Sequence, residues 1–163
     1  MRETILDEIH NCISDAVQVN GGLGHRGHVI ALSMFCAVDT ISAYAFPKTK
    51  ESCAACGRSD GIGPKYRQFI ETFFPADYRP FAGDIYGSHR NSMVHSWNLF
   101  EVGILPGHEP VKKENGALSF GLLNFFDALS EATASFFAAL SADSALQQAS
   151  LARYKELKES AHL

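Results

Sequence analysis

The sequence has little positive charge and no long apolar run. Its 163 residues carry 14 Lys and Arg against 18 Asp and Glu, a formal net charge of -4. Bulk positive charge supplies most non-specific affinity for nucleic acid, so this balance argues against binding of that kind. No apolar run approaches the roughly 18 residues of a membrane span, and the charged segment MRETILDEIHN does not resemble a secretory signal. We therefore expect a cytoplasmic protein that does not bind a membrane.

Cysteine is also scarce, and the sequence lacks a tight cluster of metal ligands. Two of its four cysteines lie at apolar positions of helical patterns, as expected in a reducing cytosol. Cys53 and Cys56 have the spacing of a zinc half-site or a redox pair, and His25 and His28 would supply two more ligands. A helix of about 19 residues between these pairs would hold them nearly 30 Å apart. We predict no metal and no cofactor, and a zinc or thiol-disulfide protein is the last alternative.

Apolar periodicity predicts a single helical domain over residues 1–163. Apolar residues make up 46% of the chain and include 12 Phe, enough for one sizeable core. Apolar positions three or four apart favour helices with one buried face, and the Phe-rich stripes at 69–74 and 120–137 are expected in the core. The helices are predicted over about residues 3–18, 27–46, 65–74, 77–86 and 122–140, with a polar helix to about Glu159 after a cap or kink at Ser141 and Asp143.

One segment between the helices changes to period two. Val111 to Lys113 and Ala117 to Phe120 flank the pair Asn115-Gly116, which is the strongest short signal for a β-hairpin. We therefore predict a small hairpin before the last long helix.

Residues 47–64 carry no period and are predicted to form the longest loop. Lys48, Lys50 and Arg58 give it a local excess of positive charge in an acidic protein. Such a patch would steer RNA toward a nearby site. The alternative is a solvated loop with ordinary charges, and it is favoured if the loop lies far from Arg90.

The segment around Arg90 combines groups suited to phosphodiester chemistry. On a helix, Tyr86 and Arg90 share the apolar face. A buried arginine must meet a carboxylate, a subunit interface or an anionic ligand. Asn91 and His95 are four residues apart and stack on an adjacent face, with Ser88 one turn back. A histidine can move the proton of a ribose hydroxyl while arginine donates two parallel hydrogen bonds to phosphate.

The sequence RNSMVH at residues 90–95 resembles the motif of the HEPN superfamily, in which Arg and His are separated by four to six residues. The preceding IYGSH, with an aromatic residue one turn before Arg90, is similar as well. The resemblance implies a helical bundle whose dimer cleft cuts RNA without metal. It also implies that Arg90 binds the scissile phosphate, His95 is the acid/base and Asn91 positions both. Related antitoxin-controlled toxins have Tyr where this chain has Trp97, so regulation through that tyrosine is not supported.

We therefore predict an all-α, HEPN-like homodimer with a small hairpin. It would be a metal-independent endoribonuclease of the toxin or defence type, with RNA as substrate and an antitoxin as partner. Tyr86 and Ser88 would join the basic loop in binding substrate. The alternative is a non-catalytic RNA-binding or dimerisation module in which Arg90 anchors the bundle, through helix carbonyls or a carboxylate such as Asp84, and His95 caps Trp97. The first is favoured if Arg90 and His95 face solvent across a two-fold axis, the second if they are packed away.

Overall fold

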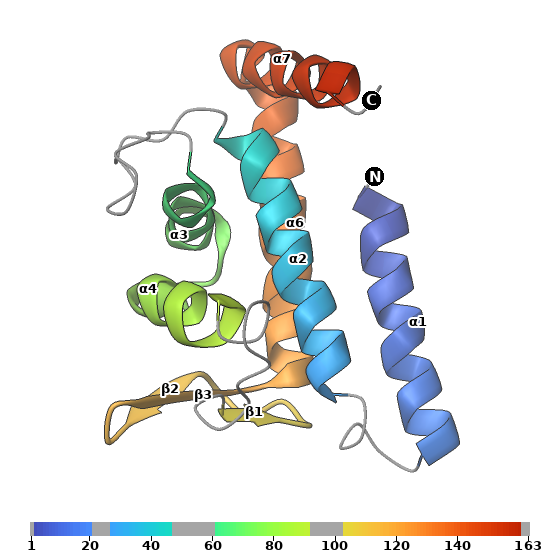
Figure 1. The fold of residues 1–163 in the computed structure, drawn as a ribbon, viewed down its shortest axis with the longest axis vertical. Coiled ribbons are helices and arrows are strands. Elements are labelled where there is room, and N and C mark those ends of the chain that lie inside the picture. Colours follow the sequence, from blue (N-terminus) through green and yellow to red (C-terminus); the bar gives the residue numbers. More distant parts are fainter. Residues whose placement is uncertain (1, 21–26, 47–60, 92–102, 161–163) are drawn as a thin grey trace.

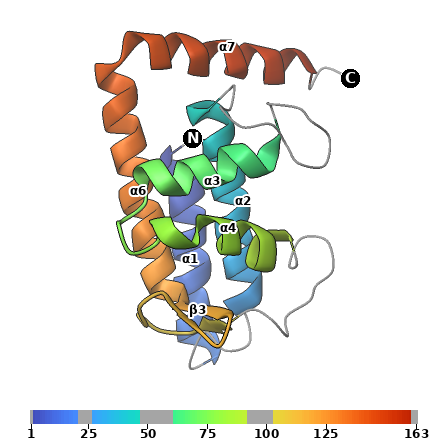
Figure 2. The same cartoon turned by 90° about the vertical axis from the view of Figure 1, so that its left-hand side faces the viewer.

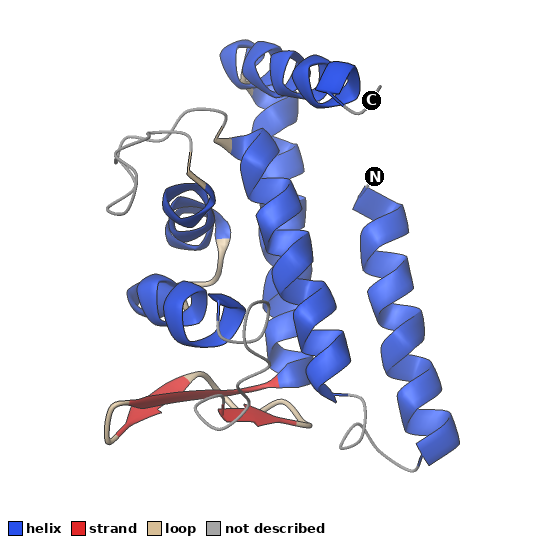
Figure 3. Cartoon of the chain, viewed as in Figure 1, coloured by secondary structure: helices blue, strands red, loops and turns tan. Residues whose placement is uncertain are grey.

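The computed structural model describes residues 2–20, 27–46, 61–91 and 103–160. This part of the chain is mostly helical, with a small three-stranded mixed sheet before the long carboxyl-terminal helices (Figure 1, Figure 3). The helical character is confirmed, but the all-α class is too narrow because the sheet has one strand more than a hairpin. The main elements are α1 (Arg2–Asn20), α2 (Gly27–Ala45), α3 (Ile62–Phe73), α4 (Ala82–Asp84), β1 (Gly103–Leu105), β2 (Lys112–Glu114), β3 (Ala117–Gly121), α6 (Leu122–Ala142) and α7 (Ser144–Ser160).

Helix α2 is the centre of the fold. Figure 1 shows α1 along one side of α2, α3 and α4 on the other side, and α6 behind it. Its buried residues lie on several faces, which explains why its sequence is apolar almost all round. By length and mean hydropathy α2 also passes for a membrane span, contrary to the expectation that no segment approaches one. Half of it is buried inside the fold, and core helices of soluble proteins pass the same test.

The core beside α2 is built from aromatic rings. Phe35 of α2 meets Phe125 of α6 and Phe120 of β3 edge-on, with ring centroids 5.5 and 6.4 Å apart. Phe120 and Phe125 stack on each other at 5.0 Å. Such ring pairs stabilise the core beyond the contribution of the large apolar area that each ring buries. The prediction that the Phe-rich stripes at 69–74 and 120–137 belong to the core is confirmed.

The sheet contains the predicted hairpin and one further strand. β2 pairs antiparallel with β3, and Glu114 lies opposite Ala117 across the two-residue turn. Asn115 and Gly116 both have positive φ, 51° and 84°, as this kind of hairpin turn requires. β1 then adds to the other edge of β3 in parallel. Its three residues are too few to show a period in the sequence, so this strand was not predicted.

A capped corner joins the last two helices. The Oδ1 atom of Asp143 accepts hydrogen bonds from the backbone N–H groups of Ala145 (2.8 Å) and Leu146 (3.1 Å), which confirms the predicted cap. After this corner α7 crosses the end of the bundle (Figure 2). The Ser150 hydroxyl donates a 2.8 Å hydrogen bond to the Tyr44 carbonyl, so α7 is fixed to the end of α2.

The helical run that bears Arg90 is irregular. A 3-10 turn (Arg79–Phe81) leads through α4 into a π-helical segment, Ile85–Asn91. The predicted regular helix over 77–86 was therefore wrong in both its bounds and its geometry. A π-helix closes its hydrogen bonds over five residues instead of four, and such segments are frequent at functional sites. Helix α3 begins at Ile62, also earlier than predicted.

Candidate functional site

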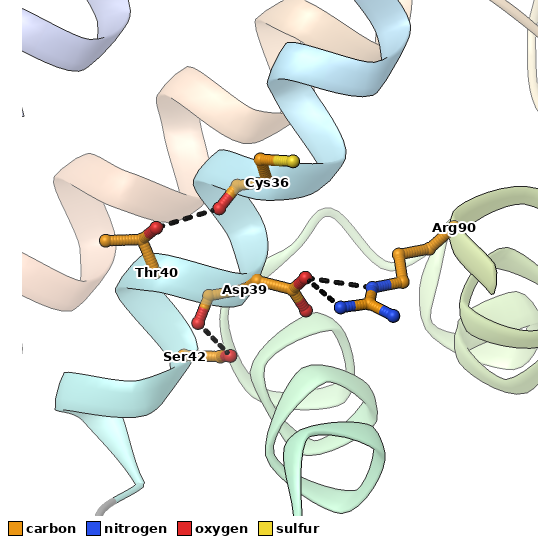
Figure 4. Close-up of polar contacts among 5 residues, drawn as sticks. All are labelled: Cys36, Asp39, Thr40, Ser42 and Arg90. Atoms are coloured by element: carbon orange, nitrogen blue, oxygen red, sulfur yellow. Dashed lines mark hydrogen bonds and ion pairs between the residues drawn. The ribbon is translucent and has the colours of Figure 1, made fainter. Parts of the chain in front are cut away.

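Arg90 is buried and pairs with a carboxylate of α2. Its side chain is 10% exposed, and that of Asp39 is 17% exposed. The Nε and Nη2 atoms of Arg90 donate hydrogen bonds of 2.8 and 2.6 Å to the same oxygen of Asp39, Oδ2 (Figure 4). A buried guanidinium cannot lose its proton, so it needs such an anion. Of the three kinds of partner predicted for Arg90, the chain itself provides a carboxylate.

The identity of that carboxylate was not predicted. Asp39 is the only Asp or Glu in α2, whose sequence is otherwise almost entirely uncharged. A single carboxylate in an apolar core helix was the signal that could have marked it as the partner of a buried cation. The suggested partner Asp84 was wrong. Asp84 instead accepts hydrogen bonds of 2.8 and 2.9 Å from Lys113 Nζ, which tie α4 to β2 at the surface.

The two oxygens of the Asp39 carboxylate have different surroundings. Oδ2 accepts both hydrogen bonds from Arg90, whereas Oδ1 is buried without a hydrogen-bond partner among the described residues. Burial raises the pKa of Asp39 above its ordinary value, and the hydrogen bond and positive charge of Arg90 offset part of that rise. The pair is therefore held by close contact against a considerable desolvation cost.

Tyr86 packs against the Arg90 side chain, and Tyr66 and Gly63 pack against Tyr86. The guanidinium carbon of Arg90 lies 5.6 Å from the centre of the Tyr86 ring, within cation–π range. The Tyr86 ring in turn lies 5.4 Å from that of Tyr66, a fully buried residue of α3. A Cβ atom at Gly63 would come within 2.8 Å of the Tyr86 ring, so this close approach requires glycine. Tyr86 is thus a packing partner of Arg90, and its predicted role in binding substrate stays a prediction.

Tyr66 gives the site a second buried polar group. Its hydroxyl has no hydrogen-bond partner among the described residues. Burial, and then the negative charge of Asp39, raise the pKa of Tyr66 well above its usual range. The phenol therefore stays neutral and cannot serve as a base at any physiological pH. Sequence reasoning did not single out Tyr66, because its spacing is that of an ordinary core residue.

The structure brings together only part of the predicted site. Ser88 is half-buried in the π-helical segment, and Asn91 is the last residue of that segment. The remaining predicted residues lie outside the described part of the chain: His95, Lys48, Lys50 and Arg58. The position of His95 relative to Arg90 therefore stays a prediction, as does the proximity of the basic loop 47–64 to Arg90.

Neither a metal site nor a disulfide is present among the described residues. Within residues 2–20, 27–46, 61–91 and 103–160, no group of three or more His, Cys, Asp or Glu side chains could hold a metal ion. Cys12 and Cys36 are free and exposed, so the prediction that they occupy apolar positions of their helices was wrong. The predicted alternative of a zinc or thiol site rests on Cys53, Cys56 and His25, which lie outside the described residues.

A groove between α1 and α2 is the second candidate region. It has a volume of about 480 Å³, is open to solvent and is mostly apolar. Partial burial and the Asp39 charge raise the pKa of the Cys36 thiol that lines it, so this thiol is a weak nucleophile. The lining includes Ile5, Glu8 and Ile9 of α1 with Leu32, Cys36 and Thr40 of α2.

Comparison with known proteins adds no family to these observations. No family model, no curated protein and no solved structure matches the chain.

Proposed function

We propose that this chain is a HEPN-like helical module that associates with a second copy of itself and does not cut RNA. The observation that carries the proposal is the buried ion pair between Arg90 and Asp39. In a module of this kind Arg90 holds the π-helical segment against α2. This anchoring role uses both members of the pair and requires no substrate.

The same pair makes Arg90 a poor ligand for phosphate. Two of its nitrogens lie 2.8 and 2.6 Å from Asp39 Oδ2, so a phosphate approaching them would meet a carboxylate, and like charges repel. If Arg90 left the pair, Asp39 would stay buried without its counter-charge, which costs about 3–5 kcal/mol. Substrate binding at Arg90 would have to overcome both effects.

Three features support self-association. The resemblance to HEPN domains implies a dimer. The groove between α1 and α2 offers an open, mostly apolar surface, and two exposed apolar side chains, Leu151 and Tyr154, adjoin on α7. The net charge of -4 gives no comparable support for a long nucleic-acid interface.

The second candidate function is a metal-independent endoribonuclease of the toxin or defence type. The observation in its favour is the π-helical segment that contains Arg90, because such segments are frequent at functional sites. In that function Asp39 would orient the guanidinium toward the scissile phosphate, His95 would be the acid/base and Asn91 would position the two. RNA and an antitoxin would then be the partners.

The two functions are distinguished by incubating a mixed RNA pool with the pure protein in EDTA. Wild type is compared with His95→Ala and with a matched control, His108→Ala, whose histidine is 66% exposed. We expect wild type and both variants to leave the RNA intact, and light scattering to give twice the chain mass of 17.8 kDa. Cleavage by wild type and His108→Ala that is lost in His95→Ala would contradict the proposal and establish the ribonuclease.

A further inference from the structure

We infer that the groove between α1 and α2 receives the exposed face of α7 from a second copy of the chain. This pairing rests on the proposed self-association and names its surface. Leu151 and Tyr154 are 53% and 51% exposed, and because they are three residues apart they lie on one face of α7. A single exposed apolar side chain needs no explanation, but adjoining ones form a patch that favours a partner.

The helix α7 of the same chain cannot fill this groove. Another face of α7 packs on α2 and α6, and the bond from Ser150 to the Tyr44 carbonyl fixes the helix across the end of the bundle (Figure 2). Leu151 and Tyr154 remain exposed in that position. An α7 helix that enters the groove must therefore come from another molecule.

The dimensions of the two surfaces agree. From Leu32 to Thr40, the groove follows α2 for eight residue steps, or about 12 Å at 1.5 Å per step. The face of α7 from Leu151 to Lys158 extends over seven residue steps, or about 10 Å. A helix laid in a groove is a common mode of recognition, with anchors three, four and seven residues apart. Leu151, Tyr154 and Lys158 have this spacing.

The charges of the two surfaces are complementary. Lys155 and Lys158 are exposed beside the apolar pair on α7. Glu8 lines the groove, and the sequence of α1 contains four acidic residues against one Arg. Opposite charges at the rim of an apolar contact favour encounter and fix its register. In a two-fold dimer each α7 would enter the partner's groove, so the contact would be made twice.

The inference is tested by sedimentation of wild type, Leu151→Glu and the matched control Ile62→Glu. Both variants place a carboxylate at an apolar position that is 53% exposed, so both should fold, as circular dichroism would verify. We expect the dimer dissociation constant to rise about tenfold or more in Leu151→Glu, because an apolar anchor is lost, and to stay unchanged in Ile62→Glu. Equal constants for all three proteins would overturn the inference.

A charge exchange tests which surfaces meet. Glu8→Lys and Lys158→Glu should each weaken the dimer by about threefold, the scale of an exposed ion pair, and the double variant should recover the wild-type constant. Additive weakening in the double variant would contradict contact between α1 and α7.

Failure of this inference differs from failure of the proposed function. A wild type that stays monomeric contradicts self-association itself and the inference with it. A dimer that is insensitive to Leu151→Glu contradicts only the assignment of the surface.

Discussion

Two faces of the same helix, α2, differ in how far the rest of the chain covers them. One face carries Asp39, which is paired with Arg90 and covered by the π-helical segment. The neighbouring face carries Leu32 and Thr40 and is only partly covered by α1, which leaves the apolar groove. The face that carries Asp39 is thus covered and paired with Arg90 of the sequence motif, whereas the face that lines the groove is open. A sequence motif identifies residues that are suited to a reaction, but a ligand can bind only where the folded chain leaves a surface exposed.

The largest expected effect on the free energy of unfolding comes from removing the ion pair between Arg90 and Asp39. Arg90→Ala would leave Asp39 buried without a counter-charge, and the free energy of unfolding should fall by about 3–5 kcal/mol. Urea denaturation measures this loss. The control is Lys113→Ala, which removes the surface pair with Asp84 and should cost no more than about 1 kcal/mol. Similar losses in the two variants would mean that the Arg90 pair contributes no more than a surface contact.

The packing around Arg90 is expected to be the next most sensitive feature. Gly63→Ala would place a Cβ within 2.8 Å of the Tyr86 ring, and such overpacking should destabilise the fold by about 1–3 kcal/mol. The matched control is Gly83→Ala in α4, because a Cβ there meets no atom within 4 Å. Thermal unfolding should therefore show a lower midpoint for Gly63→Ala alone. Equal midpoints would show that the Tyr86 ring moves aside freely.

Substitutions on the groove face of α2 should have little effect on the free energy of unfolding. Thr40 neighbours Asp39 in sequence but is exposed and lines the groove, with its hydroxyl bonded to the Cys36 carbonyl. Thr40→Ala should alter the free energy of unfolding by less than about 0.5 kcal/mol. A loss comparable to that of Arg90→Ala in the same urea titration would remove the distinction between the two faces.

The smallest expected effect is a dependence on pH. Because burial raises the pKa of Asp39 above its ordinary value of 3.8, the folded state binds this proton more tightly than the unfolded chain. The associated stability is present below pH 3.8 and is lost as the pH rises through the folded pKa. The stability of wild type relative to Asp39→Asn should therefore fall over that interval. Urea titrations at several pH values measure it, and a rise would contradict the direction of the shift.

Local patterns predicted most of the fold. The helices of the core followed from apolar spacing, and Asn115-Gly116 defined the hairpin, because both signals depend on neighbouring residues. The pairing of Arg90 with Asp39 joins positions 51 residues apart, and periodicity cannot say which faces of two helices meet. The π-helical segment left no comparable signal in the sequence. The burial of Arg90 and its need for an anion could therefore be predicted from the sequence, but the identity of its partner could not.

We propose that Arg90 stabilises the fold and takes no part in RNA cleavage. This role is tested by a variant that keeps the fold without the ion pair, because well-packed apolar residues often replace a buried ion pair at little cost. Asp39→Leu combined with Arg90→Met should unfold within about 1 kcal/mol of wild type. We would measure RNA cleavage in EDTA by this double variant and by wild type. We expect no cleavage by either protein, and cleavage by wild type that the folded double variant lacks would show that Arg90 and Asp39 take part in catalysis.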